Sequence, residues 1–329
     1  MPSEPSSATL EQKQQLTQPF THVIGQSQAI DLLVQATIRQ RIAPGYLFVG
    51  PTGVGRSLVA TAFAALMLSQ PHRPTDNLYR RIRTRNHPDL LWVEPTYLHQ
   101  GKLLTVSEAQ TAGLKRRGRP QVRLEQIREI ARFLSRPPLE SARAVVVIES
   151  AELIAEAAAN GLLKTLEEPG KATLILIAPD QQTLLPTLIS RCQTIPFRRL
   201  SSTHMTQVLT QINYPEILDH PELLSLAQGS PGSAIASWQQ LQTIPAELIQ
   251  QLNQPILAIR GALELARQIV QVLEIDSQLW LLDYLQQSRW HRGQGQGMLE
   301  LELARKQLLS YVQPRLVWEV TLMALIEPA

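Results

Sequence analysis

The sequence has one cysteine among 329 residues, Cys192. A single cysteine excludes a disulfide within the chain and any zinc site built on several cysteines. Such sparse use of cysteine is typical of proteins in the reducing cytoplasm, which is where we expect this one. The sequence indicates no histidine partner that would make Cys192 a nucleophile, so we expect a small, buried and unreactive side chain.

Long hydrophobic runs are also missing. No segment approaches the roughly 20 apolar residues of a membrane-spanning helix, so we expect no membrane association. The first 18 residues, "MPSEPSSATLEQKQQLTQ", lack the apolar core of a signal peptide and predict a disordered leader.

Charge is small overall and unevenly distributed. The formal net charge is +3, but residues 73–136 contain 14 Lys and Arg against 6 Asp and Glu, while the rest contains 17 against 22. A basic segment of this kind suits contact with nucleic acid or with an acidic protein. A solvated basic surface without a partner explains it equally well.

Short apolar runs alternate with helical patterns between about residues 20 and 200. The runs are typical of buried parallel strands and lie at 46–49, 90–93, 144–148 and 173–178. Residues 124–134 predict a helix whose apolar face is formed by Leu124, Ile127, Ile130, Ala131 and Leu134. A second helix, 155–168, ends at Pro169 and Gly170. The alternation predicts an α/β domain with a parallel sheet flanked by helices.

The rest of the chain departs from this alternation. Residues 96–122 carry the densest basic run and predict a long surface insertion. After about residue 200 only helical patterns remain. We therefore expect a leader, an α/β domain, a small helical lid and an all-α C-terminal domain, at residues 1–18, 19–199, 200–242 and 246–329.

The segment "GPTGVGRS", residues 50–57, has the glycine spacing of a phosphate-binding loop between a strand and a helix. Its candidate nucleotide-binding residues are Gly50, Gly53, Val54, Gly55, Arg56 and Ser57. Backbone N–H groups hold phosphate oxygens in such loops, and Ser57 has the hydroxyl for a magnesium ion. Arg56 replaces the usual lysine, and its larger planar fork is a poor substitute for a compact ammonium. A glycine-rich turn that binds nothing is the alternative.

A nucleotide-hydrolysing site also needs an acid for magnesium and a neighbouring base to activate water. Glu149 and Ser150 occupy these two positions after the strand at 144–148. Glu149 suits a metal, whereas Ser150 is not a base. Together with Arg56, this favours loss of hydrolysis.

Several motifs together resemble the AAA+ clamp-loader subunits of bacterial DNA polymerase III, with most similarity to the delta-prime type. The motifs are "FTHVIGQSQAI", "GYLFVGPTGVGRS", "NHPDLLWVEP", "NGLLKTLEEP" and "LLPTLISRC". The resemblance covers nearly all of the first 200 residues. It implies a nucleotide-binding domain, a lid and a helical collar through which five subunits form a ring that loads a sliding clamp onto primed DNA.

The resemblance also implies an arginine finger. In this family the triplet that matches Ser190, Arg191 and Cys192 supplies an arginine to the ATP site of the adjacent subunit. An arginine finger supplied in trans raises the rate by about 10³ to 10⁵. An ordinary surface arginine is the alternative for Arg191.

Other positions depart from the family pattern. Ala178 and Pro179 replace a polar sensor, and Ser233 stands where relatives often carry an arginine. The usual zinc-binding cysteines are missing, and His72 and His87 lack companion ligands. We expect no zinc, and magnesium only with nucleotide; whether ATP or ADP binds stays open.

Three hypotheses remain at this point. The first is a non-motor subunit that gives Arg191 to a neighbouring ATPase, with gamma/tau-type and delta-type subunits, the sliding clamp and primed DNA as partners. The second is an ATP-hydrolysing gamma/tau-type subunit, which the changes at Arg56, Ser150, Ala178 and Ser233 disfavour. The third is a nucleic-acid-binding adaptor, whose candidate contacts are Lys115, Arg116, Arg117 and Arg119.

Overall fold

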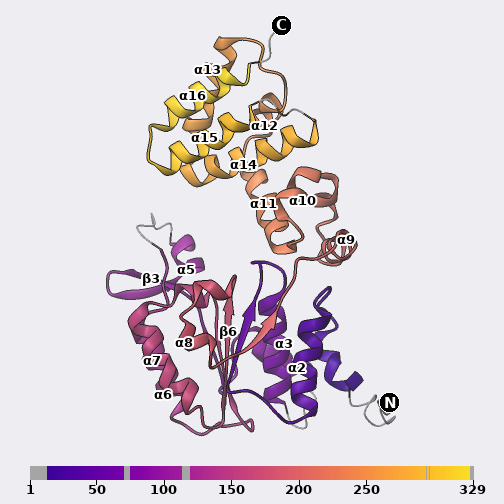
Figure 1. The fold of residues 1–329 in the computed structure, drawn as a ribbon, viewed down its shortest axis with the longest axis vertical. Helices are drawn as coiled ribbons and strands as arrows, with labels where there is room; N and C mark the ends of the chain where they lie inside the picture. Colours follow the sequence, from indigo (N-terminus) through magenta and orange to yellow (C-terminus); the bar gives the residue numbers. More distant parts are fainter. Residues whose placement is uncertain (1–12, 70–74, 113–118, 294, 296, 327–329) are drawn as a thin grey trace. The chain divides into compact units, whose positions relative to one another are not determined.

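A computed structural model describes residues 13–69, 75–112, 119–293, 295 and 297–326 (Figure 1). The chain forms two compact units, residues 1–199 and 200–329. Within the described ranges, the strands lie in the first unit and the second unit is helical. This confirms the predicted fold class, a helix-flanked parallel sheet followed by helices.

The first unit is built on a five-stranded parallel sheet in the order β2-β5-β6-β1-β7. Its strands are β1 (Gly45–Val49), β2 (Leu90–Val93), β5 (Ala144–Ile148), β6 (Ala172–Ala178) and β7 (Gln193–Pro196). The inner strands β5 and β6 are buried along their whole length, which explains their continuous apolar sequences. All four strand positions predicted above are confirmed.

Helices cover both faces of this sheet (Figure 1). They are α2 (Ser27–Ile38), α3 (Arg56–Leu68), α4 (Asp76–Arg83), α6 (Leu124–Leu134), α7 (Glu156–Glu167) and α8 (Pro186–Ile189). Residues of α6, α7 and α8 share one apolar core with alternate residues of β5 and β6. Helices α2 and α3 lie on the opposite side of the sheet.

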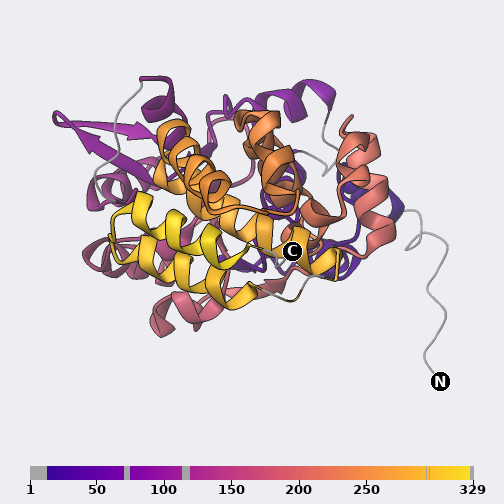
Figure 2. The ribbon, with the colours of Figure 1, turned by 90° about the horizontal axis from the view of Figure 1, so that it is seen from above.

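The basic insertion contains local structure that the sequence did not predict. Strands β3 (Thr96–His99) and β4 (Lys102–Thr105) form an antiparallel hairpin, followed by α5 (Val106–Thr111). Gln100 and Gly101 form its tight turn, with φ of 47° and 79°. Figures 1 and 2 both show this hairpin projecting from the first unit.

Two expectations are wrong in detail. Residues 13–17 are helical and Leu16 is buried, so residues 13–18 are not a disordered leader; residues 1–12 lie outside the described part. Ala131 is exposed, because Phe133 rather than Ala131 contributes to the packed face of α6.

The second unit consists of two successive groups of helices. The first group is α9 (Ser202–Gln211), α10 (Pro221–Ala227) and α11 (Pro231–Thr243). The second group is α12 (Ala246–Leu252), α13 (Ile259–Val272), α14 (Ile275–His291), α15 (Met298–Leu309) and α16 (Pro314–Ala324). Trp318 of α16 is fully buried, and its indole N–H donates to Gln278 of α14 at 2.9 Å. No helix in the described ranges is long and apolar enough to cross a membrane.

Candidate functional site

The glycine-rich loop connects β1 to α3, as the sequence predicted. Gly50 has φ of 156°, and a Cβ added there would lie 2.4 Å from the carbonyl oxygen of Phe197, so only glycine fits. Gly55, with φ of 102°, precedes the first residue of α3 and has open space where a Cβ would lie. No side chain caps this helix, which leaves its first N–H groups open to an anion.

A pocket of about 290 Å³ lies beside the loop. Its lining brings together Thr52, Gly53, Gly55, Arg56, Ser57, Leu58, Glu149, Ser150 and Ile177. The structure therefore places Glu149 and Ser150, which follow β5, next to the loop that follows β1, with β6 between the two strands. Ligands bind at this carboxyl edge in open α/β sheets.

Gln26 supports the loop from behind, and the sequence did not single it out. Its buried amide donates to the carbonyl oxygens of Val54 at 3.1 Å and Arg198 at 2.8 Å, and its oxygen accepts the Arg198 N–H at 3.2 Å. One side chain thus fixes the loop against the segment after β7. A glutamine just before a helix is too weak a signal to reveal such a role.

Arg56 is buried against its own loop rather than extended into solvent. Its Nη2 donates to Thr52 Oγ1 at 3.3 Å, whereas Nη1 is buried without a hydrogen-bond partner. Burial lowers the pKa of Arg56, and the charges of Glu152 and Glu149 oppose that shift. An unpartnered buried N–H is costly, so this guanidinium is poised for an anionic group.

A second acid, Glu152, acts on Arg56 by its charge but is not among the residues that line the pocket. Burial raises the pKa of Glu152, whose Oε2 has no hydrogen-bond partner. The sequence did not single out Glu152, because no motif position pointed to it. Ser150 adopts a left-handed conformation with φ of 50° and offers a hydroxyl where hydrolysis needs a base.

The residues present fit a phosphate group, because the loop has open N–H groups and a buried cation with a free N–H. Gly53, Val54, Gly55, Arg56 and Ser57 are the residues that would hold it, and Glu149, which lines the same pocket, would be the ligand for a magnesium ion. Ala178 is fully buried, and its methyl side chain has no polar group to contact a nucleotide. Its carbonyl oxygen accepts the Gly50 N–H at 3.3 Å. The N–H of Ser233 bonds to Ser230 Oγ at the start of α11.

Arg191 lies at the other end of the sheet. It precedes β7, and a Cβ added to Gly45, the first residue of β1, would lie 3.3 Å from the Arg191 carbonyl oxygen. The glycine-rich loop follows the last residue of β1. A strand of this length spans about 16 Å, so the arginine and the loop pocket of one chain face opposite ends of β1.

The guanidinium of Arg191 is partly exposed and ion-paired. Its Nη2 and Nε donate to Glu167 Oε1 at 2.6 and 3.0 Å, and Nη1 donates to the Thr187 carbonyl oxygen at 3.1 Å. Glu167 is the last residue of α7 and belongs to the "TLEEP" motif. Ser190 caps α8, so the short helix and Glu167 together orient the arginine.

Cys192 is mostly buried, and burial raises the pKa of its thiol from 9.0 to about 11. The thiol is therefore protonated at neutral pH and is a poor nucleophile. Its sulfur helps to fill the space beside Gly45. A packing role is what the sequence predicted.

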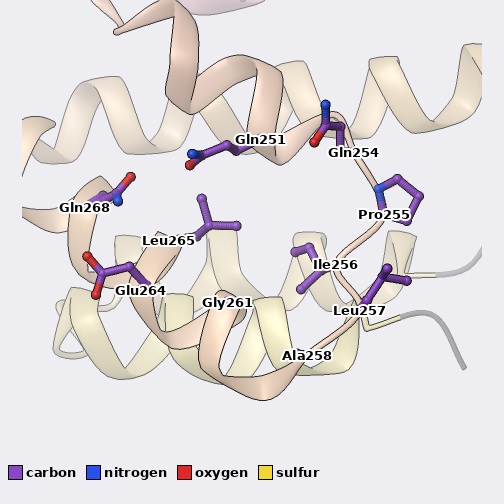
Figure 3. Close-up of a pocket in the computed structure, with 10 residues that line it drawn as sticks. All are labelled: Gln251, Gln254, Pro255, Ile256, Leu257, Ala258, Gly261, Glu264, Leu265 and Gln268. Carbon is purple, nitrogen blue, oxygen red and sulfur yellow. The ribbon is translucent and has the colours of Figure 1, made fainter. Parts of the chain in front are cut away.

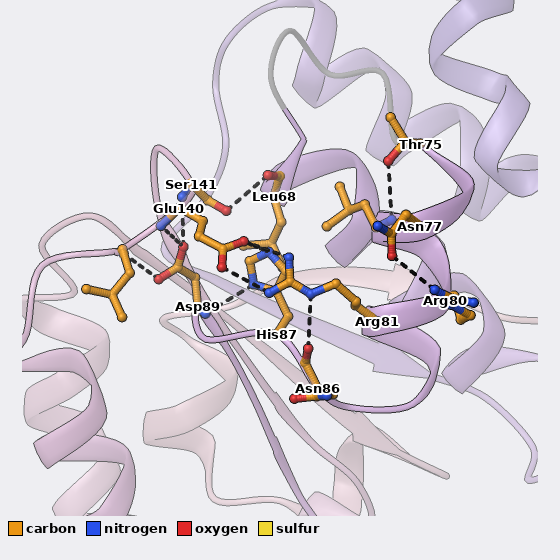
Figure 4. Close-up of polar contacts among 12 residues, drawn as sticks. Leu68, Thr75, Asn77, Arg80, Arg81, Asn86, His87, Asp89, Glu140 and Ser141 are labelled. Carbon is orange, nitrogen blue, oxygen red and sulfur yellow. Dashed lines mark hydrogen bonds and ion pairs between the residues drawn. The ribbon is translucent and has the colours of Figure 1, made fainter.

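A polar network occupies the region where the sequence lacks zinc-binding cysteines (Figure 4). Asp89 accepts the backbone N–H groups of Leu139, Glu140 and Ser141 at 2.6, 2.9 and 2.7 Å. Arg81 pairs with Glu140 through both terminal nitrogens, and His87 Nδ1 accepts the Asp89 N–H at 3.1 Å. These contacts tie α4 and β2 to the segment before β5.

No group of three metal-ligand side chains occurs within the described ranges. Burial and the charge of Arg81 lower the pKa of His87, while Glu140 and Asp89 oppose the shift. His72 lies outside the described residues, as do Lys115, Arg116 and Arg117 of the predicted nucleic-acid contact. Arg119 is described and exposed.

Comparison with known proteins decides the family. A family model described as "DNA polymerase III, delta subunit" matches residues 25–201, and one described as "Cyanobacterial DNA polymerase III delta prime, C-terminal domain" matches residues 203–325. The chain belongs to the DNA polymerase III delta-prime family. The resemblance inferred from the motifs is thereby confirmed.

Two curated relatives in this family are subunits named DNA polymerase III delta′. The Bacillus subtilis protein is 33% identical over 53% of this chain and 48% of its own length. The Pseudomonas aeruginosa protein is 32% identical over 60% of this chain and 56% of its own length. The chain thus spans about half the length of these relatives.

A solved structure of a DNA polymerase III gamma subunit-related protein from Thermotoga maritima matches with a TM-score of 0.52. The match covers 90% of this chain and 97% of that one at 14% identity. At this identity the likeness shows a shared fold and nothing more.

Proposed function

We propose that this chain is a non-motor subunit of the DNA polymerase III clamp loader. It helps to load the sliding clamp onto primed DNA and supplies Arg191 to a neighbouring ATPase. The observation that carries the proposal is the position of Arg191, which lies at the opposite end of β1 from the chain's own loop pocket. An arginine at this edge acts on a site that another subunit presents.

The contacts of Arg191 also support this role. Glu167 and Thr187 hold the guanidinium near the surface, with part of its fork accessible. A surface ion pair of this kind contributes about 0–1 kcal/mol, which is small beside the attraction of a γ-phosphate for an arginine. Arg191 can therefore exchange Glu167 for a phosphate group when a neighbouring subunit docks.

The loop pocket supports a non-motor subunit for a separate reason. Arg56 is folded against Thr52, and Ser150 stands where the base for hydrolysis is needed. We infer that the isolated chain has negligible ATPase activity whether or not a nucleotide binds. Sustained hydrolysis by the isolated chain, lost on Arg56→Ala, would favour a gamma/tau-type ATPase instead.

The helical second unit offers a surface for assembly. Exposed apolar side chains on or next to α13 and α16 are Leu257, Ile259, Leu263, Leu316, Val320 and Met323. The three on α16 are spaced i, i+4 and i+7 and share one face. Exposed apolar side chains that gather on one helix face are typical of protein–protein contact, and we assign this face to neighbouring subunits of the ring.

A groove of about 390 Å³ lies beside this surface, between α12 and α13 (Figure 3). Gln251 and Gln254 come from the α12 side, and Glu264, Leu265 and Gln268 come from α13. Gly261 leaves open space at its floor. The amide-rich rim and apolar floor resemble the composition of a subunit interface rather than a catalytic site.

A reconstituted loader tests the proposal. Arg191→Ala should lower the DNA-stimulated ATPase rate of the adjacent site by about 10³-fold or more, while size-exclusion chromatography shows an intact assembly. Lys171→Ala is the matched control, because Lys171 is an exposed cation that precedes β6 at the same end of the sheet. An Arg191→Ala loader that assembles and hydrolyses ATP at the wild-type rate would refute the role of Arg191.

A further inference from the structure

A cavity of about 700 Å³ in the second unit has no role in the proposed function. It is lined by α10, α11, the linker that follows, α12 and α14, and α10 packs against both α11 and α14 (Figure 1). The side chains that give it chemical character are His220, Glu222, Trp238, Asn253 and Tyr284. It contains neither the loop nor Arg191, so its assignment is independent of them.

The charge of the lining is negative. Glu222 is its only carboxylate, and no lysine or arginine is among the lining residues. The Glu222 side chain is only 17% exposed, so much of its hydration is lost. A carboxylate that is partly removed from water attracts a cation more strongly than one on the open surface.

The hydrogen bonds of Glu222 leave one oxygen available. Oε1 accepts from the Tyr284 hydroxyl at 3.4 Å and lies 3.3 Å from His220 Nδ1. Oε2 has no hydrogen-bond partner within the described part of the chain. Tyr284 in turn accepts from the Asn253 amide at 3.4 Å, and Arg292, outside the lining, donates to the backbone carbonyl oxygen of Asn253.

Aromatic rings complete the cavity. The half-buried Trp238 lies against His220 with ring centroids 5.1 Å apart, and Tyr284 stacks on Trp280 at 5.4 Å. Leu241, Pro245 and Ile249 add apolar walls. A carboxylate between aromatic and apolar walls suits a ligand with a cationic head and an aliphatic stem, since the stem packs on the walls and the head meets the charge.

We propose that this cavity binds the guanidinium or ammonium group of a basic side chain from a partner protein. Glu222 provides the counter-charge and Trp238 provides an aromatic wall. The neutral amides of Gln242 and Gln250 at the rim are donors and acceptors for the flanking backbone of such a segment. The volume exceeds that of one side chain and accommodates its neighbouring residues.

The test uses the full chain labelled with ¹⁵N-tryptophan, because each of its five indole N–H groups gives a separate resonance. The probes are the blocked tripeptides acetyl-Gly-Arg-Gly-amide and acetyl-Gly-Lys-Gly-amide. The neutral probe is the same peptide with citrulline, which has the shape of arginine without its charge. We expect the basic peptides to shift the Trp238 resonance at concentrations up to about 20 mM, with citrulline binding about tenfold more weakly.

Variants separate charge from shape. Glu222→Gln keeps an oxygen that accepts from Tyr284 but removes the charge. It should weaken binding of the arginine peptide about tenfold. Trp238→Leu should weaken binding as well, measured at the resonance of Trp280, which stacks on Tyr284. Trp290→Phe, at a residue 67% exposed and outside the cavity, should not weaken it. The citrulline comparison needs no variant and stands if one of them fails to fold.

Three results would overturn the proposal. They are an unshifted Trp238 resonance with both basic peptides, equal binding of arginine and citrulline peptides, and undiminished binding by a folded Glu222→Gln chain. Spermidine distinguishes the source of the cation. If spermidine shifts Trp238 and neither peptide does, a protein side chain is the wrong ligand.

Discussion

Replacing Asp89 by asparagine should destabilise the first unit far more than any change at the surface of the same network. Asp89 is 2% exposed, and its carboxylate accepts three backbone N–H groups from the segment before β5. An asparagine has one oxygen and one NH₂ group. If its oxygen keeps the Glu140 and Ser141 N–H groups, its NH₂ faces the Leu139 N–H, and that donor is left without an acceptor.

The magnitude follows from these contacts. A buried donor left unpaired costs about 1–3 kcal/mol, and each of the two remaining bonds weakens because its acceptor is no longer charged. We expect Asp89→Asn to lower the free energy of unfolding by about 2–4 kcal/mol. Glu140→Gln is the comparison, because it changes an exposed ion pair with Arg81 that is worth about 0–1 kcal/mol.

Hydrogen exchange followed by mass spectrometry is the suitable assay, because it reports the two units separately and does not assume a two-state transition of the whole chain. Peptides from β2 and β5 should exchange faster in Asp89→Asn, while peptides from α13 and α16 should not. Equal protection of β2 in Asp89→Asn and Glu140→Gln would refute the reasoning.

The same network predicts the direction of pH dependence. Burial alone would raise the pKa of Asp89, but the three N–H donors outweigh it and hold that pKa below its ordinary value of 3.8. The contribution of Asp89 to the free energy of unfolding is therefore present above pH 3.8 and is lost as the pH falls through the folded-state pKa. The pKa of His87 is also lowered, so protonation of the unfolded chain already reduces stability as the pH falls below 6.5.

The remaining predictions concern three positions, two in the glycine-rich loop and one before β7. Gly50→Ala should destabilise the first unit by about 2 kcal/mol or more, because the added Cβ would clash with the Phe197 backbone. Gly55→Ala has open space for its Cβ and should cost only about 1–2 kcal/mol of backbone strain. Thermal unfolding of the two variants compares these losses of stability. Native Cys192 should react with iodoacetamide about 100-fold more slowly than an unshifted thiol, because burial raises its pKa from 9.0 to about 11. The urea-unfolded chain should react at the rate of an ordinary thiol. An equal rate in the native and unfolded chains would contradict the burial of Cys192.

Local patterns predicted the sheet well, because strands buried on both faces need apolar side chains at every position. The runs at β5 and β6 have this property, and each is flanked by charge or a turn. The glycine-rich loop was also predicted from the sequence, and the structure explains its first glycine, because a Cβ at Gly50 would clash with the Phe197 backbone. These features depend on neighbours close in sequence or on one strong constraint.

Features that depend on distant partners were not readable. The pairing of Arg191 with Glu167 joins residues 24 positions apart, and Gln26 reaches Arg198 across 172 positions. Alternation in the hairpin β3–β4 was too short to distinguish it from a loop. Leu16 is buried by tertiary packing, although the polar sequence around it predicts disorder.

The positions of Arg56 and Arg191 explain how one chain could lack hydrolysis and still act in the proposed way. Arg56 is enclosed beside a pocket that lacks a base, and its fork is held by Thr52. Arg191 is partly exposed at the opposite end of β1, where a weak surface pair orients it. Because β1 separates them, we expect a change at the pocket to leave the presentation of Arg191 intact. A chain with this arrangement can lose hydrolysis at its own site and still provide a cation to another, which is the division of labour that a non-motor subunit requires.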